Sequence, residues 1–138
     1  MRYYRRKIVT EKKVRMSTRE EFGRVALQLG RRAEEIVLEA FDSEREKATW
    51  PEWLYDCEYS EAYSKSDQNG IDFAFMTDKG PVFVQIKSSE AGARKFEKAD
   101  RYRKNHIKIR VVVVDVRNTL HDIYLKVLSE ISSGRNEF

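Results

Sequence analysis

Three residues in the middle of the chain have side chains that together could bind a metal ion or a phosphate. Asp72 offers a carboxylate, Gln85 an amide and Lys87 an ammonium group. Asp72 belongs to one run of β-forming residues, and Gln85 and Lys87 belong to the next, with the turn-forming sequence Thr-Asp-Lys-Gly at 77–80 between the runs. We therefore expect a β-hairpin that presents all three groups.

The register of this hairpin decides whether the three groups share a face. If Met76 pairs with Pro81, every apolar residue on one face meets an apolar partner: Phe75 with Val82, Phe73 with Val84, and Ile71 with Ile86. The same register sets Asp72 opposite Gln85, and Lys87 follows on the same face. A bulge in the turn would shift the register by one residue and separate Asp72 from Gln85. The apolar pairs favour the first register, as does Pro81, which has no main-chain N–H to donate.

A carboxylate and an ammonium group on one patch of sheet allow two interpretations. The first is a solvated face with an ordinary cross-strand pair between Asp72 and Lys87. The second is a functional site, because ionised groups are rarely buried unless they are paired or bind a metal. The three residues alone leave both interpretations open.

The order of these residues resembles a known signature. Asp72, then twelve residues, then Gln85, one residue and Lys87 is similar to the motif of the PD-(D/E)xK nucleases. The local sequences at 70–72 and 84–89 are most similar to the Holliday-junction resolvase, Mrr-type restriction and homing-endonuclease branches. The resemblance implies that Asp72 holds a divalent metal ion and that Lys87 lies beside the attacking water. It also implies a restriction-endonuclease-like α/β core, with a mixed central β-sheet flanked by helices.

Gln85 departs from the commonest form of this motif, which has Glu or Asp there. An amide oxygen can still ligate a hard cation, but it brings no charge, so the affinity for metal and the choice of metal stay open. The ligand set that the resemblance implies is Asp72, Glu34, the Gln85 amide oxygen and the main-chain carbonyl of Ile86. The expected ion is Mg²⁺, or Mn²⁺ in vitro.

Glu34 lies on a long helix that the sequence predicts near the start of the chain. The capping-box sequence that begins at Ser17 predicts its start, and apolar residues at helical spacing continue it to about residue 42. On a helical wheel, Glu34 borders the apolar stripe, whereas Glu35 points away from it. The sequence at 30–34 also resembles the first helix of archaeal resolvases, whose Glu completes the metal site. The alternative is a flanking Glu34 that pairs with a nearby Arg.

The charge of the chain is unevenly distributed. The net charge is +4, but residues 1–16 contain seven Lys or Arg and one Glu, and residues 94–110 contain eight Lys or Arg and two acids, which leaves −8 on the rest. Two basic segments on an acidic body indicate a polyanionic partner, although solvated basic faces are the alternative. The residues expected to contact nucleic acid are Arg2, Arg5, Arg6, Lys7, Ser88, Arg94, Lys95, Lys98, Arg101, Arg103 and Lys104.

The remaining pattern predicts further elements. Pro51 fits the first turn of a short helix, and the alternation at 55–59 predicts a strand. Residues 90–102 predict a basic helix. Residues 107–116 predict a central strand, because their continuous apolar run is typical of burial on both faces.

A last helix is predicted from Leu120 to about residue 132, capped by Asn118 or Thr119 and ended by Gly134. A hairpin followed by a crossover to another strand indicates an α/β domain with a mixed sheet between helices. This is also the core that the resemblance implies.

The composition limits the class of protein. The chain of 138 residues is long enough for one domain, which we expect at 17–138 after a basic arm at 1–16. We expect no membrane span and no secretory signal, because no long apolar run is present. The single Cys57 rules out an intrachain disulfide and suits the cytoplasm, while one Cys and two His, both expected at the surface, form no zinc cluster.

These expectations favour a metal-dependent DNA endonuclease, with RNA as a substrate left open. By analogy with resolvases and restriction enzymes, a homodimer is expected. One alternative is an inactive nucleic-acid-binding module of the same fold, for which the neutral Gln85 is the best argument. Another is an interaction protein whose basic segments contact an acidic partner.

Overall fold

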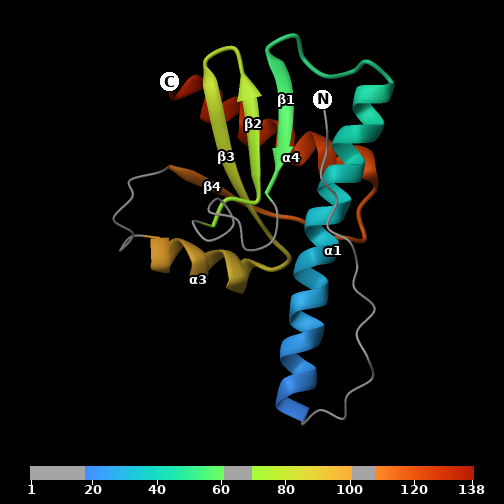
Figure 1. The fold of residues 1–138 in the computed structure, drawn as a ribbon, viewed down its shortest axis with the longest axis vertical. Coiled ribbons are helices and arrows are strands. Elements are labelled where there is room, and N and C mark those ends of the chain that lie inside the picture. The colour runs from blue at the N-terminus through green and yellow to red at the C-terminus, as the bar shows by residue number, and fades with distance from the viewer. Residues whose placement is uncertain (1–17, 61–69, 101–107) are drawn as a thin grey trace.

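The computed structural model describes residues 18–60, 70–100 and 108–138 of the protein (Figure 1). The elements in these ranges are α1 (Thr18–Glu46), β1 (Leu54–Tyr59), β2 (Phe73–Thr77), β3 (Gly80–Lys87), α3 (Glu90–Asp100), β4 (Ile109–Val113) and α4 (Leu120–Asn136). The predicted α/β fold with a mixed sheet is confirmed. None of the described helices is both long and apolar enough to cross a membrane.

The four strands form one sheet in the order β1-β2-β3-β4. Strand β2 is antiparallel to both of its neighbours, β1 and β3, whereas β3 and β4 are parallel. In the β2–β3 hairpin Met76 pairs with Pro81, which confirms the predicted register. The turn at 78–79 is closed by Thr77, whose hydroxyl donates to the carbonyl oxygen of Gly80 at 2.7 Å. Gly80 has a φ of +135°, which side chains rarely permit.

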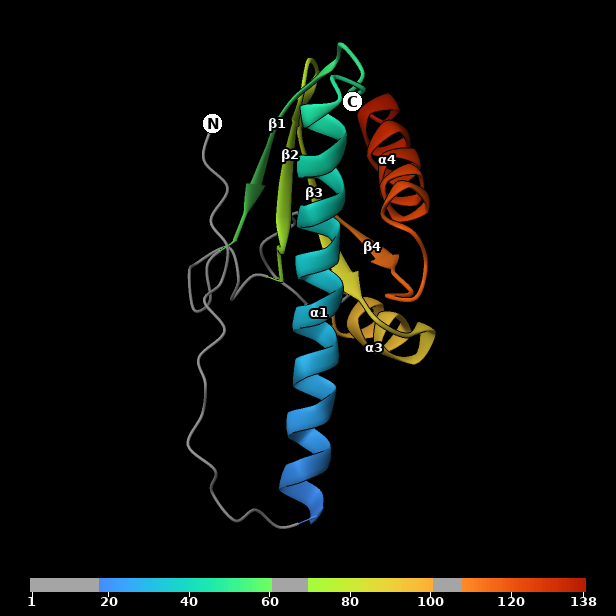
Figure 2. The same cartoon turned by 90° about the vertical axis from the view of Figure 1, so that its right-hand side faces the viewer.

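Helices α1 and α4 pack together on one face of the sheet (Figure 2). Phe41 of α1 links three elements, because its ring centroid lies 4.8 Å from that of Phe75 on β2 and 4.9 Å from that of Tyr124 on α4. The hairpin residues that face these helices are the predicted apolar set, and all are buried: Phe73, Phe75, Val82, Val84 and Ile86. The opposite face of the hairpin is therefore available for polar groups.

Helix α3 connects the parallel strands β3 and β4, which cannot be joined by a tight turn. It begins at Glu90, directly after the loop that follows Lys87, and lies at the end of the sheet where β3 finishes (Figure 1). Ala93 and Phe96 are its buried side chains within the described part of the chain. The helix thus packs against β3 and β4 through a narrow stripe of side chains, and most of its surface is exposed to solvent.

Two boundaries in the first half of the chain differ from the prediction. Helix α1 continues to Glu46 rather than ending near residue 42. The short helix predicted at Pro51 is absent; a turn lies there, in which the amide of Leu54 donates to the carbonyl oxygen of Pro51 at 3.1 Å. Leu54 then pairs with Thr77, so sheet pairing prevents the turn from continuing as a helix.

The prediction that β4 is a central strand is wrong. Within the described sheet β4 pairs only with β3 and forms an edge. Val112 is the one buried residue of the strand, and the others are half-buried. The apolar run is explained by partial cover on both faces rather than by two neighbouring strands.

Helix α4 begins as predicted and ends later. Thr119 is its N-cap, since the amide of Asp122 donates to the Thr119 hydroxyl at 3.1 Å. The predicted end at Gly134 is wrong, because the helix continues to Asn136. Gly134 instead permits close packing: a Cβ at this position would lie 2.7 Å from a methyl group of Val82.

Candidate active site

Asp72 lies immediately before β2 and is fixed by its main chain on both sides. Its amide donates to the carbonyl oxygen of Val84 at 3.0 Å, and its carbonyl oxygen accepts from the amide of Ser60 at 2.9 Å. The side chain is buried, and Oδ2 accepts a hydrogen bond from the amide of Ile86 at 2.7 Å. Asp72 is therefore held rigidly across the open end of the hairpin.

Glu34 comes from the middle of α1 and meets Asp72 at this end of the sheet. The residue is 7% exposed, and its carboxyl group shares a hydrogen bond with that of Asp72. Its neighbour Glu35 is only half-buried. The structure thus brings together the two carboxyl groups that the sequence assigned to a metal site.

Contact with a second buried carboxyl group changes the protonation of Asp72. The pKa of Asp72 is raised well above its ordinary value, first by burial, then by the charge of Glu34 and the hydrogen bond with it. The amide of Ile86 and the charge of Lys87 act in the opposite direction but are weaker. A proton or a cation is needed to hold the pair together, because two adjacent carboxylates repel each other.

Gln85 connects this pair to Lys87. Only one orientation of its amide gives both ends a partner: the nitrogen donates to Asp72 Oδ2 at 3.3 Å and to the carbonyl oxygen of Gly70, and the oxygen accepts from Lys87 Nζ at 3.2 Å. Gln85 is buried and Lys87 is half-buried. We call Glu34, Asp72, Gln85 and Lys87 the polar cluster.

Lys87 has a further contact that the residue pattern did not predict. Its ammonium nitrogen lies over the ring of Phe96 on α3, 5.2 Å from the centroid. Phe96 lies within the segment 90–102, which was predicted as a basic helix. Its position nine residues after Lys87 gave no signal, since the contact depends on how α3 folds back at the end of β3.

The chemistry of the polar cluster fits a hard divalent cation. Glu34 and Asp72 provide carboxylate oxygens, the ligands that Mg²⁺ and Mn²⁺ prefer. Within the described ranges no group of three or more His, Cys, Asp or Glu could hold a metal, so the charged ligands that these ranges offer here are Glu34 and Asp72. The other two predicted ligands have different partners in the structure. The Gln85 amide oxygen accepts from Lys87, and Ile86 contacts Asp72 through its main-chain N–H.

The predicted nucleic-acid contacts fall into two groups. Ser88, Arg94, Lys95 and Lys98 are exposed in the loop after Lys87 and on α3. The remaining predicted contacts lie outside the described residues: Arg2, Arg5, Arg6, Lys7, Arg101, Arg103 and Lys104. The predicted contacts that the structure describes therefore lie in the loop and the helix that directly follow Lys87.

A second polar group joins α1 to α4. The buried carboxylate of Glu44 accepts a hydrogen bond from the Thr49 hydroxyl and contacts His121 Nδ1 at 2.8 Å. These two hydrogen bonds lower the pKa of Glu44. His121 is mostly exposed, as expected of a surface residue, but its bond to Glu44 was not predicted because the two residues are far apart in sequence.

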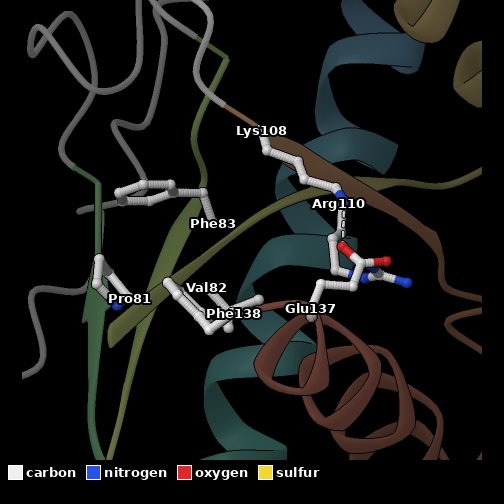
Figure 3. Close-up of a pocket in the computed structure, with 8 residues that line it drawn as sticks. Pro81, Val82, Phe83, Lys108, Arg110, Glu137 and Phe138 are labelled. Carbon is white, nitrogen blue, oxygen red and sulfur yellow. Dashed lines mark hydrogen bonds and ion pairs between the residues drawn. The ribbon is translucent and has the colours of Figure 1, made fainter. Parts of the chain in front are cut away.

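A pocket of about 290 Å³ lies at the other end of β3 (Figure 3). Its lining comprises Pro81, Val82, Phe83, Lys108, Arg110, Gly134, Glu137 and Phe138. Its cationic side chains are paired, since Arg110 binds Glu130 and Glu137, and Lys108 binds Glu137. The pocket therefore offers mainly an apolar wall and lies apart from the polar cluster.

Comparisons with protein-family models, curated proteins and solved structures found no match to this chain. The resemblance to the PD-(D/E)xK nucleases thus rests on the sequence motif alone.

Proposed function

We propose that this protein is a metal-dependent nuclease that hydrolyses phosphodiester bonds in DNA. The observation that carries the proposal is the buried contact between the carboxyl groups of Glu34 and Asp72, in one connected cluster with Lys87. Burying two acids against each other is unfavourable for folding, and a bound cation would remove the repulsion between them. An ammonium group beside such a pair is suited to a reaction at a phosphate.

Each residue would have a separate role. Asp72 and Glu34 would hold the metal ion, which polarises the scissile phosphate and lowers the pKa of a bound water. Lys87 would orient the attacking water or stabilise negative charge on the phosphorus centre in the transition state. The exposed Arg94 and Lys95 on α3 would hold backbone phosphates.

One specific observation favours a second function, that of an inactive nucleic-acid-binding module. The neutral Gln85 stands where the motif usually has an acid, and its amide oxygen is engaged by Lys87. Such a module would keep the basic surface of α3 and bind DNA without cutting it.

The deciding experiment incubates the protein with supercoiled, linear, single-stranded and four-way-junction DNA in Mg²⁺, Mn²⁺ or EDTA. The nuclease proposal expects metal-dependent cleavage that Asp72→Asn and Lys87→Ala abolish, with DNA affinity kept within several-fold. Binding without cleavage in any metal would establish the module instead. Sedimentation of the complex would show whether two copies act together, as expected for cutting both strands.

A further inference from the structure

We infer that Phe96 is a positioning residue that holds the ammonium group of Lys87 against Gln85 of the polar cluster. The inference rests on the proposed nuclease function for its catalytic consequence. Its structural part, the contact between the ring and the ammonium group, is independent of that function.

The Lys87 ammonium group is bracketed by two partners from different elements. The Gln85 amide oxygen lies 3.2 Å from Nζ, and the Phe96 ring centroid lies 5.2 Å from it. The face of an aromatic ring attracts a cation, more strongly where solvent is excluded. Because Phe96 is only 9% exposed, the ring is itself held by packing and fixes one side of a flexible side chain.

The first turns of α3 also lie close to the aliphatic part of the Lys87 side chain. Gly92 and Phe96 are four residues apart and share a face of the helix. A Cβ at Gly92 would lie 3.8 Å from Lys87 Cδ, so the helix backbone runs close along the aliphatic part of the lysine. The helix that holds Lys87 is the one that exposes Arg94 and Lys95. Docking of a phosphate backbone on α3 and placement of Lys87 therefore involve one element.

The test uses two substitutions at the ring and one matched control. Phe96→Leu keeps an apolar side chain but removes the aromatic ring, whereas Phe96→Tyr keeps an aromatic ring. Phe83→Leu removes a half-buried aromatic residue from β3, the strand of Lys87, at the pocket end. All three variants are first compared with wild type by thermal unfolding, so that loss of fold is recognised.

The first measurement is the NMR signal of the Lys87 ε-methylene group, assigned with Lys87→Arg. The ring current of Phe96 should shift this signal in wild type and in Phe96→Tyr. The shift should disappear in Phe96→Leu and persist in Phe83→Leu. An unchanged signal in folded Phe96→Leu would overturn the inference, whether or not the protein cleaves DNA.

The second measurement is the single-turnover cleavage rate at saturating DNA and metal. Phe96→Leu should lower the rate about tenfold while the half-saturating DNA concentration stays within about twofold, and Phe96→Tyr should recover most of the rate. A wild-type rate in Phe96→Leu, or a loss of DNA affinity alone, would refute a positioning role. Absence of cleavage in wild type would refute the nuclease function, and the NMR signal would still decide the contact.

Discussion

The contact between Glu34 and Asp72 is the centre of the proposed active site, and it depends on the side of α1 that Glu34 occupies. Glu34 is buried against Asp72, whereas the adjacent Glu35 is half-buried. The two glutamates are chemically identical and differ in direction by about 100° around the helix. They therefore form a matched pair for a test of the site.

We expect Glu34→Gln to lower DNA cleavage by at least about tenfold, a loss of about 1.4 kcal/mol in transition-state stabilisation, because it removes a charged metal ligand. Glu35→Gln should leave cleavage and stability nearly unchanged. Cleavage rates of the two variants at saturating metal measure the difference. The opposite ranking, or full activity in both, would remove α1 from the active site.

The role of Gln85 as a metal ligand can be tested by a substitution that adds a charge and hardly changes the shape of the side chain. We predict that Gln85→Glu tightens Mg²⁺ binding or keeps activity, because it adds a carboxylate beside Asp72, and that Gln85→Ala weakens metal binding. Titration of Mn²⁺ by calorimetry measures both effects. The same metal affinity in wild type and both variants would show that Gln85 is no ligand and serves only to link Asp72 to Lys87.

The raised pKa of Asp72 predicts a pH dependence of stability without metal. The folded protein keeps a proton that the unfolded chain releases, so the free energy of unfolding falls as the pH rises above the ordinary value of 3.8. Asp72→Asn cannot ionise and should raise Tm by about 3–5 °C at neutral pH in EDTA. Thermal unfolding between about pH 4 and about pH 8 measures this, with Glu35→Gln as control. A lower Tm for Asp72→Asn at neutral pH would contradict the assignment.

At the scale of elements, the sequence predicted what depends on local periodicity. The alternation of Phe73 and Phe75 with Asp72 was enough to give the hairpin and its register, and the helical stripe was enough to set Glu34 toward the sheet. The position of β4 at the edge was not predictable, because strand order is set by tertiary pairing. The contact of Lys87 with Phe96 was missed for the same reason, since it requires the path of α3.

Gly134 allows a test at this scale. The sequence predicted that it ends the last helix, whereas in the structure it allows α4 to pack closely against Val82. Gly134→Ala would place a Cβ 2.7 Å from Val82 and 2.9 Å from Arg110, so it should destabilise the protein by about 1–3 kcal/mol despite the better helix propensity of Ala. Gly92→Ala on α3 would place a Cβ 3.2 Å from the Ser89 hydroxyl and 3.8 Å from Lys87 Cδ, which both belong to exposed or half-buried side chains, and should be nearly neutral. Urea unfolding of both variants tests the comparison, and equal stability would refute close packing at Gly134.

At the scale of the whole molecule, positive charge is concentrated in two segments of the sequence, and the described part of the second includes most of α3. Arg94, Lys95 and Lys98 are exposed on α3, the helix whose Phe96 contacts Lys87. If they contact phosphates of duplex DNA, binding should weaken with salt in proportion to the number of contacts.

We therefore expect the triple alanine variant of Arg94, Lys95 and Lys98 to reduce the slope of log K against log salt by up to about 2.7. A control triple variant changes exposed basic residues outside α3, namely Lys79, Arg117 and Lys126. Fluorescence anisotropy over a range of salt concentrations measures both slopes. Equal slopes for the two triple variants would mean that α3 is not the DNA-binding surface.

The division of the polar cluster between α1 and the hairpin also has a consequence for the order of folding. The hairpin can form from local contacts and would then hold Asp72, Gln85 and Lys87, but the carboxyl pair exists only after α1 has docked. The step that closes the core around Phe41 is therefore the step that completes the site. If the proposed nuclease function is right, a chain in which α1 is loosened would keep the basic helix and lose the acid pair, and so would bind DNA without cutting it.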